Sequence, residues 1–371
     1  MKQVTECDFG TKAVLTAPLS LEGEESNSEY RAPNIIQRIL SLLTSLPPQF
    51  NIPKSQLQCY GESVYSISSN MLSKCAEGET SLNRFVSVVA WSISMVRPLA
   101  FGLAPYNPVL GETHHVSRGT LNVLLEQVSH HPPVSALHAT DEKQNIDVLW
   151  CQSPLPKFHG THIEIEVHGK RQLKLLNKNE TYTMSPPNLV IRFLPVPGVD
   201  WLGMQQSDVK KLALKQSCVT EGTRFCPDHL YIGRLKERSF CRRRWRLFMR
   251  LTATGIVKDV KTGKKTVIYN AKEALTGLKT PIVKDPKAVL STESAVVWGE
   301  VSQGILQKSW DKAREAKTCI EERQRQVARE KTSREDEWSP KHFIVSHSKE
   351  SGWDCSPTHM LVPPAPIVVN D

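Results

Sequence analysis

The chain has 371 residues, of which 39% are hydrophobic and 23% are charged, which is typical of a water-soluble globular protein. It contains no apolar run long enough to span a membrane and its first residues lack an apolar core, so we expect neither a transmembrane helix nor a secretory leader. Nine scattered cysteines favour the reduced thiols of a cytosolic protein over a disulfide framework. Most of the net charge of +9 lies between Gly203 and Gly255.

The N-terminal part of the chain is polar over residues 1–29 and is expected to be disordered. Apolar residues then recur at helical spacing between Pro33 and Pro47, which predicts a helix with a wide apolar face. An ordinary core helix would have the same pattern. Its position near a chain end also allows a lid or membrane-contacting role, for which the candidate residues are Ile35, Ile36, Ile39, Leu40 and Leu43.

Helical patterning covers 55–95, with Ser81 as a candidate N-cap, and a proline-rich irregular run follows over 99–111. From Leu121 the period changes to two, which predicts half-buried strands. These strands are expected at 121–125, 162–168, 173–176, 181–184, 188–194 and in a hairpin over 256–269, with a turn at 168–170. Closely spaced strands with short turns favour an antiparallel barrel or sandwich.

The C-terminal part returns to helical patterning after Pro286. Ser309 is a candidate N-cap for a charged helix that ends near Arg334. Residues 351–371 include the proline-rich run 363–366 and are predicted to form a flexible tail.

The most unusual stretch is Glu126–Pro133, which reads Glu-Gln-Val-Ser-His-His-Pro-Pro directly after an apolar strand. Proline has no backbone donor for a sheet, so Pro132 ends the strand and leaves His130 and His131 at its rim. Two such histidines are more often surface residues of a corner than ligands. Two imidazoles held at a strand end would nevertheless suit an anion such as a phosphate.

This stretch resembles the signature of the oxysterol-binding protein family. The loop 106–112 is similar to the family's Asn-Pro-aliphatic-Leu-Gly-Glu segment, and 338–343 is similar to its closing Trp-x-Pro-Lys motif. The resemblance covers most of 80–202 and 256–345 and points to the short plant-type branch. It implies a mainly β fold with helices, namely an incomplete antiparallel β-barrel that encloses a lipid tunnel. An N-terminal helical lid and a C-terminal helical flank complete the lipid-binding domain, which we expect over 30–350.

The same resemblance implies a phosphoinositide headgroup site. On the charged helix, Lys317, Glu321 and Arg325 are spaced i, i+4, i+8 and share one face. Such residues are usually solvated ion pairs. The family, however, has a lysine, a glutamate and an arginine at this spacing around the headgroup. The implied site is therefore Asn107, His130, His131, Lys317, Glu321 and Arg325.

Two departures from the family pattern are visible. Ala104 stands where many members have a lysine, and Arg97 or Arg118 is a candidate substitute. Residues 204–254 carry no strand pattern of the family, so we hypothesise a shifted reading frame there, which reading the coding DNA in the other two frames would test. If the segment is genuine, barrel strands are expected to be missing or altered within it.

Other kinds of function find less support. The basic run 242–250 contains Trp245 and has the composition of a nucleic-acid contact, but it lies in the departing segment, and we expect no nucleic-acid partner. The pairs 114–115 and 130–131 are adjacent histidines, which point to opposite faces of a strand and rarely bind one metal ion together. No arrangement of nucleophile, acid and base is visible, so we expect no enzyme, no cofactor and no metal.

The function that the family resemblance implies is to bind sterols and/or phosphatidylinositol 4-phosphate and to transfer them between membranes. The alternative is a lipid-sensing adaptor at membrane contacts that does not transfer lipid in bulk. In either role we expect a monomer in the cytosol that associates peripherally with intracellular membranes.

Overall fold

The computed structural model describes residues 12–20, 46–67, 70–99, 101–194, 197–202, 206–211, 214–219, 230–233, 254–259, 265–334, 338–348 and 352–370. The proposed lid or membrane-contacting residues Ile35, Ile36, Ile39, Leu40 and Leu43 lie outside these ranges, and so does the basic run 242–250.

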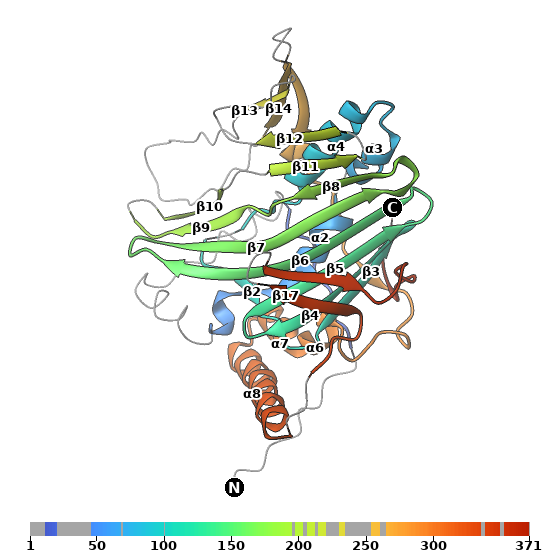
Figure 1. Ribbon diagram of the computed structural model, residues 1–371. Coiled ribbons are helices and arrows are strands. Elements are labelled where there is room, and N and C mark those ends of the chain that lie inside the picture. The colour runs from blue at the N-terminus through green and yellow to red at the C-terminus, as the bar shows by residue number, and fades with distance from the viewer. Residues whose placement is uncertain are drawn as a thin grey trace.

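A large, twisted and mainly antiparallel sheet dominates the described part of the chain (Figure 1). Ten of its 12 strands are hydrogen-bonded to one another in the order β12-β11-β8-β7-β6-β5-β4-β3-β19-β16. The other two extend from β7, with β9 paired to β7 and β10 paired to β9. The bounds are β3 (Thr113–Arg118), β4 (Leu121–His130), β5 (Pro133–Asp141), β6 (Ile146–Phe158), β7 (His162–Leu175), β8 (Glu180–Met184), β9 (Asn188–Arg192), β10 (Gly198–Leu202), β11 (Gln206–Lys211), β12 (Leu214–Val219), β16 (Ile282–Val283) and β19 (Ile367–Val369). The predicted antiparallel β fold is therefore confirmed as an open, strongly curved sheet.

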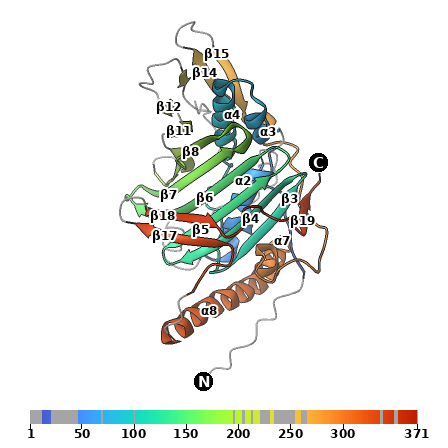
Figure 2. The same ribbon diagram turned by 45° about the vertical axis from the view of Figure 1, so that its right-hand side comes forward.

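Smaller sheets flank the large one. They are formed by β1 (Asn51–Ser55) with β2 (Ala104–Tyr106), by β13 (Leu230–Gly233), β14 (Thr254–Asp259) and β15 (Lys265–Asn270), and by β17 (Phe343–Ser348) with β18 (Gly352–Pro357). The β17–β18 hairpin lies in front of β5 and β6 (Figures 1 and 2). Strands β14 and β15 confirm the predicted hairpin over 256–269.

The described helices gather on the other side of the sheet and at its lower end in Figure 1. They are α2 (Gln56–Tyr65), α3 (Met71–Glu77), α4 (Ser81–Ser94), α5 (Ala271–Ala274), α6 (Ser294–Val297), α7 (Gly299–Leu306) and α8 (Trp310–Arg334), with 3-10 turns η3 (Pro48–Phe50) and η4 (Leu176–Lys178). Helix α2 packs on β3 and β4. The core between helices and sheet is centred on Leu57, Trp91, Leu125, Leu137 and Leu173, all fully buried.

Local capping explains where two of the N-terminal helices begin. Ser55 caps α2 with a capping box, in which the backbone nitrogen of Ser55 donates to Gln58 Oε1 at 2.8 Å. Helix α4 is capped by Thr80, whose hydroxyl accepts a hydrogen bond from the Asn83 backbone nitrogen at 3.1 Å. The prediction of Ser81 as cap is therefore wrong by one residue, because either hydroxyl residue fits the sequence pattern. Helix α8 begins at Trp310, directly after the predicted cap Ser309.

The expected turn at 168–170 is wrong, because β7 continues through it. Gly169 has φ +120° and lies opposite Gln152 in the ladder with β6. A Cβ atom there would lie 1.9 Å from the carbonyl oxygen of Cys151. Glycine is needed here because a neighbouring strand passes close by, and not because the chain reverses.

The flexible tail expected over 351–371 is also wrong for residues 352–370. Strand β18 pairs with β17, and β19 pairs with β3 in parallel and with β16 in antiparallel register. Ile367 is fully buried, and the backbone nitrogen of Ala365 donates to Ser117 Oγ at 2.7 Å. The prolines before β19 are thus part of its approach to the sheet.

The segment 204–254, in which barrel strands were expected to be missing or altered, contributes β11 and β12 to the large sheet, and β13 pairs with β14. Most of its other residues lie outside the described ranges. Among the described residues, no helix is both long and apolar enough to cross a bilayer.

Candidate functional site

The two signature histidines lie at the β4–β5 hairpin, as predicted. His130 is the last residue of β4 and pairs with Pro133, so His131 and Pro132 form the turn. His130 is half-buried, and its Nδ1 atom lies 2.9 Å from the carbonyl oxygen of Pro108. His131 is exposed, and its ring stands edge-on to that of His130 with centroids 4.7 Å apart. Burial lowers the pKa of His130, and the neighbouring His131 lowers it further.

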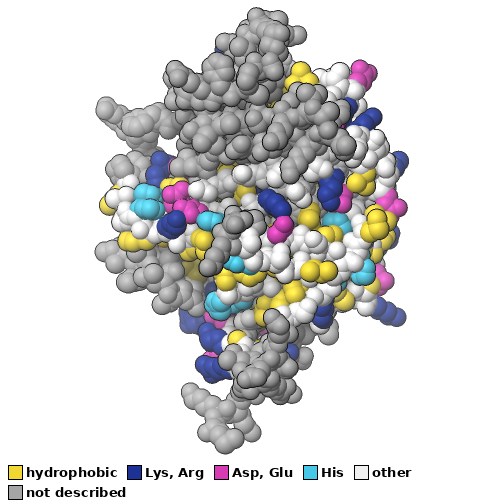
Figure 3. Space-filling model, in the orientation of Figure 1, with side chains coloured by type: hydrophobic (Ala, Val, Ile, Leu, Met, Phe, Trp, Pro, Cys, Tyr) yellow, Lys and Arg dark blue, Asp and Glu magenta, His cyan; other side chains and the backbone are white. Residues whose placement is uncertain are grey.

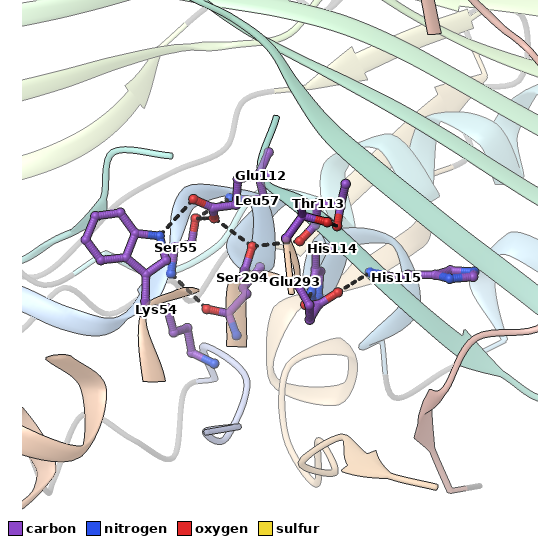
Figure 4. A network of polar contacts seen from close by, with 12 residues as sticks. Lys54, Ser55, Leu57, Glu112, Thr113, His114, His115, Glu293 and Ser294 are labelled. Atoms are coloured by element: carbon purple, nitrogen blue, oxygen red, sulfur yellow. Dashed lines mark hydrogen bonds and ion pairs between the residues drawn. The ribbon is translucent and has the colours of Figure 1, made fainter. Parts of the chain in front are cut away.

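The loop before β3 is held in place by a buried carboxylate, that of Glu112 (Figure 4). Ser55 and Ser294 donate their hydroxyls to it, Trp298 donates Nε1 at 2.8 Å, and the Val109 backbone nitrogen donates at 3.0 Å. Burial raises the pKa of Glu112, and these four donors oppose the rise. Because Ser55 is the cap of α2 whereas Ser294 and Trp298 belong to α6 and its C-cap, the carboxylate ties the loop to two other parts of the chain.

The same loop is bonded to β4. The backbone nitrogen of Gly111 donates to Gln127 O at 2.9 Å, and the nitrogen of Gln127 donates to Glu112 O at 2.8 Å. Gly111 has φ +77°, a conformation that favours glycine, and its Cα faces the ring of Trp338. The Asn-Pro-Val-Leu-Gly-Glu loop, the signature strand and the closing motif therefore meet at one place.

Helix α8 lies across the lower end of the sheet and supplies the third part of the candidate site (Figure 2). Lys317 is only 6% exposed. Its ammonium group donates a hydrogen bond to the carbonyl oxygen of Leu46, and its Nζ atom lies 3.6 Å from Glu321 Oε1. Burial lowers the pKa of Lys317, and Glu321 opposes the change. Arg325 is exposed one turn further on.

Gln324 connects this helix to the loop, because its Oε1 atom accepts from the Leu110 backbone nitrogen at 3.2 Å. Asn107, in the same loop, is exposed. The loop 107–112 thus contacts the histidine hairpin on one side and α8 on the other. These contacts bring together the three elements that carry the predicted residues. Among the predicted side chains, Lys317 and Glu321 form an ion pair, and the rings of His130 and His131 are in contact.

The two arginines considered as substitutes for the missing lysine do not lie at this rim. Arg118 ends β3, about 20 Å along the strand from the loop, and donates to the carbonyl oxygens of Tyr65 and Ile67. Arg97 is buried in the cavity wall and donates to two carbonyl oxygens of α2 and its C-cap. Ala104 lies in β2, where its carbonyl oxygen accepts from Asn51.

A cavity of about 400 Å³ lies directly behind the loop. Asn107 and Pro108 form part of its wall, and most other lining side chains are apolar. They come from η3, α2, the segment 99–108 and strands β6, β7, β9 and β10, with Phe50, Ile165, Leu189 and Phe193 among them. A concave, mainly apolar space with a few polar groups is typical of a small-molecule site.

One polar cluster in this wall was not predicted. Arg171 is buried, its guanidinium lies 4.4 Å from the ring centre of Trp150, and burial lowers its pKa to about 10. When the Gln152 amide is oriented with its oxygen toward Arg171, this oxygen accepts hydrogen bonds from Arg171 Nε at 2.6 Å and from Arg171 Nη2 at 3.0 Å. The sequence did hold a signal, because Arg171 occupies an inward position in the alternation of β7, between Val167 and Leu173.

The other histidine pair has a structural role. His114 is buried between Tyr65 and Glu293, with Nε2 3.0 Å from the Tyr65 hydroxyl and Nδ1 2.6 Å from Glu293 Oε1. His115 points elsewhere, with Nε2 2.9 Å from the carbonyl oxygen of Pro363. The two rings therefore do not converge on one ion, as the strand alternation predicted.

An open curved sheet around an apolar cavity, with polar residues at its rim, defines a class of proteins that enclose a hydrophobic ligand. Comparison with known proteins places the chain within that class. A family model described as Oxysterol-binding protein matches residues 40–221. Oxysterol-binding protein-related protein 4B of Arabidopsis thaliana is 48% identical over 96% of this chain and 97% of its own length, and protein 4A is 45% identical over the same shares. The chain belongs to the oxysterol-binding protein family.

Solved structures share the fold. The Osh1 ORD domain in complex with cholesterol matches with a TM-score of 0.67 at 18% identity, covering 94% of this chain and 90% of that one. The Osh3 ORD of Saccharomyces cerevisiae in complex with PI(4)P matches with a TM-score of 0.58 at 18% identity, covering 92% and 91%. The predicted family and fold are therefore confirmed.

Proposed function

We propose that the protein binds one lipid at a time, a sterol or phosphatidylinositol 4-phosphate, and transfers it between membranes. The observation that supports this proposal most directly is the cavity of about 400 Å³, whose wall includes the loop residues Asn107 and Pro108. Enclosing a lipid there removes the cost of exposing its hydrocarbon to water, about 25 cal/mol per Å². The ligands named for the related ORD structures support the two lipid classes. No covalent step and no cofactor are needed.

The rim is proposed to hold the phosphorylated headgroup. The residues are Asn107, His130, His131, Lys317, Glu321 and Arg325, and their three elements meet around the loop 107–112. Lys317 now donates to a carbonyl oxygen, and a phosphate would be a stronger acceptor for its charge. Glu321 would keep Lys317 oriented, and Arg325 would add a second cation.

We further propose that one lipid-binding domain extends from the predicted start at residue 30 through β19 and also includes 12–20, because Val14 N donates to Ala295 O at 2.9 Å and Leu19 lines the cavity. We also propose that the polar pair Arg171 and Gln152 meets the polar end of a bound lipid. The protein would act as a cytosolic monomer that visits intracellular membranes peripherally.

The test is extraction and transfer from liposomes that contain either a sterol or phosphatidylinositol 4-phosphate. The double change His130→Ala with His131→Ala should abolish phosphoinositide extraction and leave sterol extraction largely intact. His359→Ala, an exposed histidine elsewhere, is the control. Equal loss of both lipids would contradict the headgroup assignment.

A second variant tests the cavity. Ile165→Trp fills space in its wall and should reduce extraction of both lipids. Tight binding with slow exchange in the unmodified protein would favour the lipid-sensing adaptor over the carrier.

A further inference from the structure

Strand β7 carries two different faces. Ile165 and Val167 line the cavity, so the alternate residues lie on the outer face of the sheet. At the hairpin end of β7 these outward residues are His162, Glu164, Glu166 and His168, and Lys170, Gln172 and Lys174 follow them. Histidine and glutamate therefore alternate with apolar residues over the first half of the strand, next to the hairpin turn. In Figure 3, histidine and acidic side chains gather at the left edge, where the tip of the β6–β7 hairpin lies in Figure 1.

Three of the side chains at this tip converge. One ligand atom each from His159, His162 and Glu164 lies within 4.8 Å of the others. The two imidazole rings stack with centroids 4.8 Å apart and planes 13° apart, and His159 Nε2 lies 3.9 Å from Glu164 Oε2. Zinc ligands lie about 2.0 to 2.2 Å from the ion, so each atom would move by about 1 Å, and the stacked rings would turn so that their nitrogen lone pairs point to the shared ion.

The backbone holds the tip in this shape. His159 N donates to His162 O at 2.9 Å, and Thr161 N donates to His159 O at 2.9 Å. Gly160 has φ +79°, as the turn between the histidines requires. Phe193 N donates to Thr161 O at 2.9 Å, which fixes the turn to the end of β9.

Outer partners orient the ligands further. Asn188 Nδ2 donates to Glu164 Oε1 at 2.9 Å, which leaves Oε2 toward the histidines, and Thr161 Oγ1 lies 3.3 Å from His162 Nδ1. Such second partners are typical of metal ligands. The nearby cation Lys157 is paired with Glu166 at 2.6 Å and does not occupy the cluster.

We propose that His159, His162 and Glu164 form a binding site for a divalent transition-metal ion such as Zn²⁺, with water completing a tetrahedral shell. Two imidazoles and one carboxylate suit Zn²⁺, Co²⁺ or Ni²⁺, whereas Mg²⁺ and Ca²⁺ prefer oxygen ligands. The site lies on the outer wall of the cavity, and a bound ion would tie the hairpin turn to β7. It requires no lipid and is independent of the proposed transfer function.

The test titrates the full-length, metal-free protein with CoCl₂ at pH 7.5, following the visible d–d bands, and with ZnCl₂ by calorimetry. One equivalent should bind with micromolar affinity. His159→Ala, His162→Ala and Glu164→Gln should each weaken binding at least tenfold. His168→Ala is the matched control, because it removes a histidine from the same strand face outside the cluster, and it should leave binding unchanged. Affinity should fall from pH 7.5 to 5.5, because protons compete for imidazole.

Unchanged Zn²⁺ affinity in the three variants would overturn the proposal, as would a Co²⁺ spectrum with thiolate charge-transfer bands, which would assign the ion to cysteines. Absence of Co²⁺ and Zn²⁺ binding up to millimolar concentration would overturn it too. His159 is 44% exposed, so its replacement should not unfold the chain, and circular dichroism of each metal-free variant checks this.

Discussion

The carboxylate of Glu126 accepts hydrogen bonds from the backbone nitrogens of Lys341 and His342, each at 2.9 Å. The first residue of the histidine signature thus anchors the closing motif, more than 200 residues away in the chain. Glu126 is fully buried, so no water could accept hydrogen bonds from the two backbone nitrogens if the carboxylate were removed.

Glu126→Gln should therefore destabilise the fold by about 1.5 kcal/mol, because an amide offers one oxygen where the carboxylate offers two. Hydrogen exchange at Lys341 and His342 should accelerate more than exchange in α4. Glu142→Gln, at an exposed site, is the control and should change neither quantity. Uniform acceleration across the chain would mean that Glu126 contributes only to global stability.

Lys317→Met tests the helix contribution to the rim. Removing a charge-assisted donor should weaken phosphoinositide binding about 10- to 100-fold. The thermal midpoint should stay the same or rise, because burial already disfavours this cation, as its lowered pKa indicates. Lys312→Met, on the exposed face of the same helix, should leave binding unchanged. Equal affinity of Lys317→Met and the unmodified protein would remove Lys317 from the site.

Gly169→Ala should destabilise the protein by more than about 3 kcal/mol, because strain at positive φ adds to a clash with the Cys151 carbonyl. Gly277→Ala is the matched control, because Gly277 has φ +64° but a Cβ atom added there would have no atom within 4 Å. This change should lower the free energy of unfolding by only about 1 kcal/mol. Urea unfolding compares the two. Similar losses would mean that β6 and β7 can separate at this point.

The buried pair Arg84 and Glu180 predicts a pH dependence. Hydrogen bonds from Arg84 lower the pKa of Glu180 to about 2. The pKa of Glu180 is therefore lower in the folded protein than in the unfolded chain, where it is near about 4.3. The ionised carboxylate stabilises the fold fully above that pH, and this stabilisation is lost as the pH falls toward 2. Glu180→Gln should therefore lose about 3 kcal/mol at pH 7, and this difference from the unmodified protein should shrink between pH 4.5 and 2. Urea unfolding at several pH values measures it, and a constant difference would contradict the assignment.

The local parts of the candidate site could be read from the sequence, and its assembly only from a resemblance. The His130–His131 corner follows from an apolar strand that meets two prolines, and the helix face of Lys317 follows from i, i+4 spacing. The bonds that join them, from Gln324 to Leu110 and from His130 to Pro108, link residues 214 and 22 positions apart. No local pattern encodes such pairs.

The errors have a similar origin. A lone glycine between polar residues reads as a turn, and the approach of Cys151 that requires Gly169 is visible only across the ladder. The prolines at 363–366 read as a tail, although the strand that follows them finds β3. The proposed metal ligands His159 and His162 carry no local sequence signal, because their approach to each other and to Glu164 depends on the hairpin turn.

Strand β19 covers an edge of the large sheet on which self-association could otherwise begin. Without residues 362–370, β3 would lose its partner along the three residues Val116, Ser117 and Arg118, and this exposed edge would be a template on which another copy could add a strand. With β19 in place, the sheet instead ends at β16, which is only two residues long. We therefore expect β19 to protect this edge from pairing with another copy, so that removal of residues 362–370 should promote aggregation.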